Sequence, residues 1–445
     1  MTQSMEGLLP RLERLGEMAK HNKSLQFNNL LHHLNLAMLT KAYYQLNKRA
    51  ARGVDNMGWY DYQTDAKRRL AALHQRIQSG RYKAQAVKRI WIPKGNGEER
   101  PIGVTAIEDK IVQQAVVWLL EPIYESDFLG FSYGFRSERN QHQALDAVYM
   151  AITTKKVSWI LDADLKGFFD AIDHEWMIKF LKLRIADKRD RWLIQGWLSA
   201  GVVDGDEKHK SFVGTPQGGV ISPLLANIYL HYALDLWVHQ WRKRHARGEV
   251  YIVRYADDFV IGLQYQSDGH RIKAAIQARL AKFKLRLNES KTHLLEFGRF
   301  AKQNRQQRGQ SKPETFDFLG FTHICSQRRS DAGFQLMRLS IKKKLKAKLA
   351  HIKEQLMKTR HKSIFEVGNW LKRSLTGYFN YFAVPGNKSS LNTMRTEVCK
   401  LWIKTLRRRS QKGSNFNWQR MSKLIRIFIP HTRLRHPYPS QRFTL

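Results

Sequence analysis

Hydrophobic residues recur with two different spacings along this chain, and the change of spacing predicts where strands give way to helices. Residues 157–165 (VSWILDADL) form an apolar run that ends in alternating acids, as expected of a buried strand. Residues 250–263 have the pattern of a strand, a turn and a second strand. Residues 81–105 predict two short strands around the Gly-rich turn PKGNGEERP, and further strands are expected near 283–297 and 316–324.

Helical spacing separates these segments. Residues 1–50 are helical and basic in pattern, and residues 218–240 predict one long helix. Residues 106–126 predict another helix, whose apolar stripe is Ile107, Ile111, Val112, Ala115 and Leu119.

The character of the chain changes near residues 325–340. Ser340 is the expected N-cap of a helix whose apolar positions are Ile341, Leu345, Leu349, Ile352 and Leu356. More helices are expected to about residue 410, followed by an irregular tail that contains Pro430, Pro437 and Pro439. We therefore expect an α+β part followed by a helical, basic part.

The net charge of the chain indicates what kind of molecule it binds. The 445 residues include 77 Lys and Arg against 38 Asp and Glu, a net charge of +39, which points to a polyanion. No run approaches the ~18 apolar residues of a spanning helix, and the first residues lack the apolar core of a signal peptide, so nucleic acid is a better candidate than a membrane. The two cysteines, Cys325 and Cys399, cannot form a zinc site alone and fit a reducing cytoplasm.

Adjacent aspartates stand between apolar runs in VRYADDFVIG. Asp257 and Asp258 would fall at the tip of the predicted hairpin, where an Asp-Asp pair usually caps a turn. A second acidic strand end changes the interpretation, because Asp162 and Asp164 share one face of their strand. If the two strands are neighbours, Asp164 converges with the Asp257–Asp258 pair. Such carboxylates repel one another unless cations bind between them, and two Mg²⁺ ions could then clamp a phosphoryl transfer.

Cationic side chains near these segments could hold a triphosphate. Lys94 and Arg100 flank the predicted turn in IPKGNGEERP, where a solvated hairpin tip is the alternative. Lys291 follows a predicted strand in LNESKTH, and a surface lysine is the default there.

Seven sequence blocks in a fixed order resemble the reverse transcriptases encoded by group II introns. The resemblance runs from about residue 25 to the end. Its seven blocks are LQFNNLLHHLNLAMLTKAYYQLNKRAARGVDNM, IPKGNGEERPIGVTAIEDKIVQQAV, LDADLKGFFDAIDHEWM, GTPQGGVISPLLANIYLH, RYADDFVIG, LNESKTH and FDFLGF. Beyond them, the C-terminal GNWLKRSLTGYFNYFAVPGN, LWIKTLRRRSQKG and HPYPSQRF resemble the thumb and maturase region of the same family. A single YADD motif is weak evidence for this family, whereas the whole ordered set of blocks is specific to it.

The resemblance implies a right-hand polymerase fold. Residues 1–80 would form an N-terminal extension and the start of the fingers, 81–330 the fingers and palm, and 331–445 a helical thumb and maturase region. It also implies RNA-directed DNA synthesis from dNTPs on an RNA template with a DNA primer, and binding of group II intron RNA to promote splicing and retrohoming.

By motif match, Asp164, Asp257 and Asp258 would be the catalytic ligands of two Mg²⁺ ions. The nucleotide would contact Lys94, Arg100, Phe168, Gln217 and Lys291. Phe168 would be the aromatic gate that rejects a 2′-OH, with Phe169 in the core, and Gln217 would line the nucleotide site within TPQGG.

Basic residues interleaved with aromatics suggest RNA contacts in the C-terminal third. A dense cluster next to Trp402 and Trp418 contains Arg407, Arg408, Arg409 and Lys412, and the expected helix after Ser340 carries Lys342, Lys343 and Lys346. Arg136 and Arg139 belong to a motif that departs from many relatives, because SERN stands where they have a Pro-Gly pair after GFR.

Two other readings remain open at this point. The chain could be a splicing chaperone that retains only a polymerase shell, or a reverse transcriptase recruited by the host for repair or defence. It ends without the Cys- and His-bearing nuclease domain of many relatives, so no DNA-cutting domain is expected. A bacterial cytoplasm, with association to the nucleoid through nucleic acid, is the expected location, while a monomer or a homodimer is equally compatible.

Overall fold

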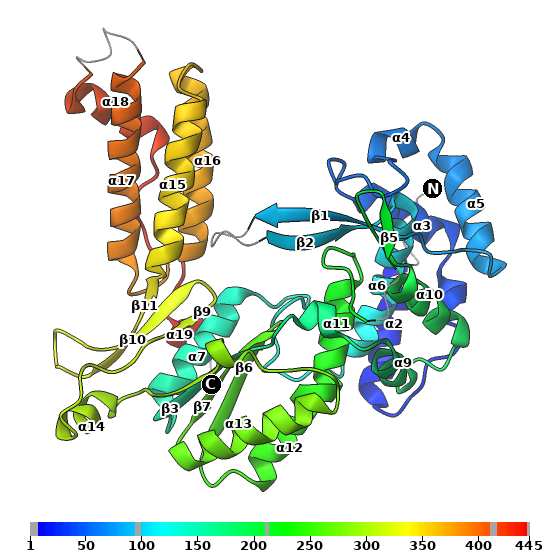
Figure 1. Ribbon diagram of the computed structural model, residues 1–445, viewed down its shortest axis with the longest axis horizontal. Helices are drawn as coiled ribbons and strands as arrows, with labels where there is room; N and C mark the ends of the chain where they lie inside the picture. Colours follow the sequence, from blue (N-terminus) through cyan, green and yellow to red (C-terminus); the bar gives the residue numbers. More distant parts are fainter. Residues whose placement is uncertain (1–7, 94–98, 210–212, 410–415, 443–445) are drawn as a thin grey trace.

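The computed structural model describes residues 8–93, 99–209, 213–409 and 416–442 (Figure 1). Three sheets and many helices alternate along the chain, which confirms the predicted mixed α+β class with antiparallel sheets. The N-terminal helices are α2 (Leu8–His21), η1 (Leu30–His33), α3 (Leu36–Gln45), α4 (Trp59–Gln63) and α5 (Ala66–Gln78). They pack around α6 (Ile107–Glu125), whose predicted apolar stripe is buried throughout.

The first sheet has the order β2-β1-β4-β5 and stands beside these helices. Its strands are β1 (Val87–Pro93), β2 (Glu99–Val104), β4 (Val202–Asp204) and β5 (Glu207–His209). The expected strand pair around the Gly-rich turn is confirmed by the antiparallel pairing of β1 with β2. Helices α8 (Phe168–Ala171), α9 (His174–Lys182) and α10 (Lys188–Ser199) precede β4 in the chain.

The central sheet is antiparallel, with the order β6-β7-β3-β8. Its strands are β3 (Trp159–Asp164), β6 (Val250–Tyr255), β7 (Asp258–Leu263) and β8 (His293–Glu296). Because side chains alternate across a strand, Leu161 and Ala163 face the large core while Asp162 and Asp164 face the other side. Helix α13 (Gln266–Ala281) packs against β3, β7 and β8, and α7 (Gln141–Thr154) packs against β6 and β7.

The long helix expected over residues 218–240 is confirmed with one interruption. It runs as α11 (Ser222–Leu230), a π-helical turn η2 (His231–Asp235) and α12 (Leu236–Arg244). The strand expected near 283–297 is shorter than predicted, because residues Glu289–Lys291 form the 3₁₀ turn η3 and only β8 is extended.

The third sheet connects the central sheet to the C-terminal helices. Its order is β11-β10-β9, with β9 (Phe316–Phe318), β10 (Phe321–Gln327) and β11 (Phe334–Ser340), and α14 (Ala301–Gln307) precedes it. Ser340 is the last residue of β11 and Ile341 occupies the N-cap position, so the expected cap at Ser340 is wrong by one residue. The predicted boundary at residue 330 falls between two strands that pair with each other.

The C-terminal helices stand apart from the sheets as an upright bundle (Figure 1). They are α15 (Lys342–Lys358), α16 (Ile364–Phe382), α17 (Lys388–Arg407) and α18 (Trp418–Phe428). Their core is separate and includes Ile352, Leu356 and Trp402. The tail is less irregular than expected, because it includes the strongly amphipathic helix α18.

The end of the described chain returns from this bundle to α7. The short helix α19 (Pro439–Arg442) packs on α7, where Arg442 pairs with Asp146 at 3.4 Å. The rings of His436 and His142 stack with centroids 3.7 Å apart. Arg338 of β11 also pairs with Asp146, so α7 contacts both the start and the end of the C-terminal part.

Among the described helices, none combines the length and the apolar character that crossing a bilayer requires.

Candidate active site

Register in the central sheet brings the predicted acidic strand ends together. Strands β6 and β7 form a hairpin in which Tyr255 pairs with Asp258, so Ala256 and Asp257 make the turn. Asp164, the last residue of β3, is the direct cross-strand partner of Asp258. Directly opposed residues in an antiparallel pair have Cβ atoms about 4.5–5.5 Å apart on the same face. The expected proximity of Asp164 to the Asp257–Asp258 pair is therefore confirmed.

Lys291 holds the carboxylate of Asp164 in this structure. Its Nζ lies 2.7 Å from Asp164 Oδ2, and Asn288 Nδ2 donates to the same oxygen at 3.4 Å. Lys291 is placed there by the 3₁₀ turn η3, which follows the isolated bridge between Leu287 and Leu165, the residue after β3. The predicted nucleotide lysine is thus a partner of the acidic group, and its contact with a nucleotide stays a prediction.

Burial and mutual repulsion raise the pKa values of the neighbouring acids. The pKa of Asp258 is raised well above its ordinary value, first by burial and then by Asp162 and Asp164. Burial also raises the pKa of Asp257. Burial, with Asp317 of β9 next, raises the pKa of Asp162 to about 7. Crowded carboxylates of this kind are stabilised by cations and hard divalent ions prefer oxygen ligands, so the donor set suits Mg²⁺.

The side chains are not arranged as a finished metal site. Among the described residues, no group of three or more His, Cys, Asp or Glu side chains lies in a geometry that could hold a metal ion. Asp164 faces Lys291 instead, and this ammonium supplies a positive charge beside the acids. Chemistry and register fit the predicted cations, while the coordination itself stays a prediction.

Arg100 and Gln217 contact each other as members of one hydrogen-bonded chain. Arg100 Nε donates to Gln217 Oε1 at 2.6 Å, and Gln217 Nε2 donates to Asp170 Oδ2 at 3.4 Å. The backbone N–H of Gly103 donates to Gln217 O at 2.7 Å, which binds the TPQGG segment to β2. Two predicted nucleotide residues from distant segments are thus neighbours; Lys94 lies outside the described residues.

Glycine makes this close approach possible. Gly218 has φ +118°, and a Cβ there would lie 2.7 Å from the carbonyl oxygen of Gly103. The absence of a side chain at Gly218 therefore lets the backbone of β2 pack directly against the TPQGG segment.

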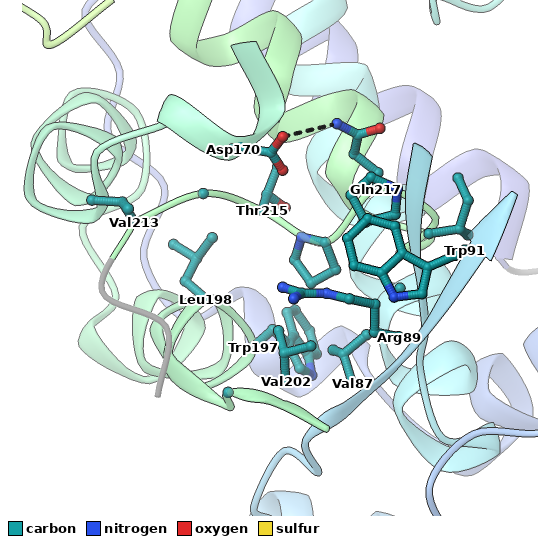
Figure 2. Close-up of a pocket in the computed structure, with 16 residues that line it drawn as sticks. Val87, Arg89, Trp91, Asp170, Trp197, Leu198, Val202, Val213, Thr215 and Gln217 are labelled. Carbon is teal, nitrogen blue, oxygen red and sulfur yellow. Dashed lines mark hydrogen bonds between the residues drawn. The ribbon is translucent and has the colours of Figure 1, made fainter. Parts of the chain in front are cut away.

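A pocket opens between β1, β2 and the TPQGG segment (Figure 2). Apolar side chains line most of it, and polar groups enter from Arg89, Asp170, Thr215 and Gln217. Burial raises the pKa of Asp170, while Arg89 and Arg100 oppose this effect. A mostly apolar hollow with a few directed polar groups is typical of a small-molecule or base-binding site. Asp170 was not among the predicted site residues, although its place in LDADLKGFFDAID, two residues after Phe168, was a usable signal.

Phe168 does not face this pocket. It is only 2% exposed and packs in the core, with its ring 5.5 Å from Phe169 and 6.5 Å from Tyr229. Phe169 instead meets Phe135, a half-exposed residue that also contacts Tyr255 of the hairpin. Phe169 also belongs to the main core cluster, as expected, whereas the gate role of Phe168 finds no support in the packing.

The predicted RNA contacts fall into two classes. Arg136 is buried, with Nε and Nη2 on Glu125 and Nη1 on the carbonyl oxygens of Leu129 and Ser132, so its role is structural and the RNA assignment is corrected. Arg139 is half-buried and lies over the ring of Tyr133.

In the C-terminal bundle, the exposed predicted residues are Lys342, Lys343, Lys346, Arg407 and Arg408. Arg409 is half-buried and donates to Lys362 O, and Lys412 lies outside the described residues. Trp402 is fully buried in the bundle core and cannot stack on a base, whereas Trp418 is half exposed.

Comparison with known proteins places this geometry in a family. The family model described as reverse transcriptase (RNA-dependent DNA polymerase) matches residues 92–323, more than half of the chain. Protein YkfC of Escherichia coli is 34% identical over 276 residues, which cover 54% of this chain and 71% of YkfC. Group II intron-encoded protein LtrA of Lactococcus lactis is 35% identical over 246 residues, 55% of this chain and 40% of LtrA.

A plant relative, the mitochondrial Nuclear intron maturase 2 of Arabidopsis thaliana, is 28% identical over 174 residues, 30% of this chain and 23% of the relative. The chain therefore spans about two fifths of LtrA and less of this maturase. The predicted enzyme class, an RNA-directed DNA polymerase, and the resemblance to group II intron-encoded proteins and intron maturases are confirmed. This chain belongs to the reverse transcriptase (RNA-dependent DNA polymerase) family.

Proposed function

We propose that the central sheet performs two-metal nucleotidyl transfer, in a right-hand arrangement of fingers, palm and thumb. The observation that carries this proposal is the cross-strand pairing of Asp164 with Asp258 beside Asp257. In this assignment residues 1–80 form the extension and the start of the fingers, 81–330 the fingers and palm, and 331–445 the thumb and maturase region.

In this proposal the acidic residues bind the metal ions and the neighbouring polar residues bind the nucleotide. Asp164, Asp257 and Asp258 would hold two Mg²⁺ ions, which activate the primer 3′-hydroxyl and neutralise the leaving group when bound. Lys291 balances the charge of Asp164, and its ammonium would also be available to the phosphates of the incoming dNTP. Arg100 faces the same space and lowers the cost of negative charge on Asp257. Gln217, fixed between Arg100 and Asp170, orients the nucleotide.

Primer extension on an RNA template tests this mechanism. Asp257→Ala should abolish dNTP incorporation and leave RNA binding intact, and Asp206→Asn, an exposed acid in the β4–β5 turn, is the matched control that should keep full activity. Activity should require Mg²⁺ and disappear on chelation. Full activity of the Asp257 variant would refute the assignment, and a wild type that extends nothing would favour the chaperone alternative.

We further propose that the C-terminal bundle binds structured intron RNA to promote splicing and retrohoming. Lys342, Lys343 and Lys346 project from the start of α15. A hollow between α15 and α16 is lined by Lys362, Phe365, Lys372 and Arg373, among others. Phe365 is 67% exposed in the middle of this basic surface, the arrangement that suits an unpaired base with its phosphates.

Phe365→Ala should weaken binding of the chain's own intron RNA, by about 1–3 kcal/mol if one base stacks there. Phe300, an aromatic of similar exposure before α14, provides the control in Phe300→Ala. Equal RNA affinities of the two variants would show that the hollow is not part of the RNA-binding surface. Whether intron RNA domains flank the gene would separate an intron-linked enzyme from one recruited by the host.

A further inference from the structure

Arg254 is a completely buried charge two residues before the Ala256–Asp257 turn. None of its side chain is exposed. Nε and Nη2 form a fork on the carboxylate of Asp235, at 2.8 and 2.6 Å. Nη1 donates to Asn227 Oδ1 at 3.1 Å and to Ala256 O at 2.9 Å, and Nη2 also donates to Ser132 Oγ at 2.7 Å. A guanidinium has five N–H groups, and here each has an acceptor.

These acceptors come from four separate parts of the chain. Asn227 lies on α11, and Asp235 ends the π-helical turn η2. Ser132 lies in a segment that forms a parallel bridge with Arg254 itself, through Arg254 N to Phe131 O and Tyr133 N to Arg254 O. A π-helical turn shifts the register of a helix, and here it delivers the Asp235 carboxylate to the guanidinium. The fourth part is the turn at Ala256.

The turn is held in a backbone conformation that alanine rarely adopts. Ala256 has φ +57°. A non-glycine residue in this region persists where the surroundings over-determine it. Two contacts do so: the bond from Arg254 Nη1 to Ala256 O, and the backbone of Gly134, where a Cβ would lie 2.3 Å from Ala256 N. Asn227 Nδ2 in turn donates to Gly134 O at 2.7 Å, which closes the network.

We propose that Arg254 is a positioning residue for nucleotidyl transfer, which fixes the Ala256–Asp257 turn and thereby the direction of both adjacent carboxylates. The inference rests on the proposed role of Asp257 and Asp258. Arg254 touches neither substrate nor cation, and it acts through the turn alone.

Arg254→Lys keeps the charge opposite Asp235, but one ammonium cannot contact Asp235, Asn227, Ser132 and Ala256 together. Arg338→Lys is the matched control, because Arg338 is an equally buried partner of an aspartate, Asp146, and contacts no part of the hairpin. The readouts are kcat and the KM for dNTP in primer extension, the Mg²⁺ concentration at half-maximal rate, and the unfolding midpoint in denaturant.

Both lysine variants should lose stability to a similar extent. Arg254→Lys should also lower kcat by about 10–100-fold and raise the Mg²⁺ requirement, since a displacement of about 1 Å can cost about 10²-fold, while the KM for dNTP stays within about twofold. Arg338→Lys should retain kcat within about twofold. Adding Ala256→Gly to Arg254→Lys should recover part of kcat, because glycine adopts a positive φ without strain. Equal kcat in the two lysine variants would overturn the proposal.

Ser132→Ala serves if Arg254→Lys does not fold. It removes one acceptor and leaves the Asp235 fork intact, and it should lower kcat about threefold or more; an unchanged kcat and Mg²⁺ requirement would refute the positioning role. Failure of the underlying function is distinguishable, because in that case the wild type itself would not extend a primer or Asp257→Ala would retain activity.

Discussion

Gly134 lies against the backbone of the acidic hairpin, and Gly134→Ala provides a sharp test of how closely this turn must be held. A Cβ at position 134 would lie 2.3 Å from Ala256 N and 3.0 Å from the carbonyl carbon of Tyr255. These atoms are backbone and cannot rotate away. Gly130, in the same segment, has nothing within 4 Å of its added Cβ, and neither glycine has a positive φ. Gly130→Ala is therefore a matched control.

The magnitude follows from the overlap. Carbon contacts are most favourable near 3.5 Å, so the hairpin or the Gly134 segment must move by about 1 Å. Overpacking of this size costs about 1–3 kcal/mol, whereas Gly→Ala at an open position gains about 0.4–1 kcal/mol by restricting the unfolded chain. The two variants should differ in unfolding free energy by about 1.4–4 kcal/mol. A shift of about 1 Å at Asp257 and Asp258 should also lower kcat by up to about 10²-fold.

Urea unfolding followed by tryptophan fluorescence measures the first difference, and single-nucleotide extension of a DNA primer on an RNA template measures the second. Measurements below the unfolding transition ensure that both variants are folded during the assay. If Gly134→Ala matches Gly130→Ala in stability and in kcat, the hairpin tolerates displacement, and the reasoning about Gly134 and the turn is wrong.

Three other outcomes follow from burial and charge. Burial raises the pKa of Asp190 to about 7, so between about pH 4 and pH 7 the folded state retains a proton that the unfolded chain has released, and unfolding free energy falls as pH rises. Asp190→Asn should flatten this fall and be more stable than the wild type at pH 8 but not at pH 4; parallel pH profiles from denaturant titrations would contradict it. Phe168→Leu should lower stability and leave the preference for dNTP over rNTP unchanged, whereas relaxed selectivity in single-turnover incorporation would restore the gate role. Replacement by Gln of the three lysines that open α15 should reduce the slope of log K against log salt for RNA by about 2 in filter binding, and an unchanged slope would exclude them from phosphate contact (Lys342, Lys343 and Lys346).

The sequence predicted best what depends on neighbouring residues. Alternation placed Asp162 and Asp164 on one face of a strand, and the flanking apolar runs predicted the hairpin. Its turn is Ala256–Asp257 rather than the expected Asp257–Asp258, because Asp258 already pairs with Tyr255. The convergence of Asp164 with the Asp257–Asp258 pair was expected only on the condition that the two strands are neighbours, and the pairing of β3 with β7 meets that condition.

The remaining features of the site depend on contacts between residues that are far apart in the sequence. Arg136 is buried because Glu125 and two carbonyl oxygens surround it, and no local pattern in GFRSERN indicates this. Phe168 and Phe169 are adjacent in sequence and both buried, and only the orientation of the short helix α8 decides that Phe169, not Phe168, meets Phe135. Arg254 was part of the quoted RYADD motif without a role, since its acceptors lie up to 122 residues away.

The stacking of α19 on α7 has a mechanical consequence. The C-terminal bundle is joined to the rest of the molecule both where it begins, through β11, and where the described chain ends, through Arg442 and His436. Both attachments converge on α7, whose neighbours include β6 and β7 of the acidic hairpin. Because the bundle is attached at two points, it cannot rotate about one hinge without breaking a contact with α7. The orientation of the bundle relative to the rest of the molecule is thereby fixed at two points on one helix.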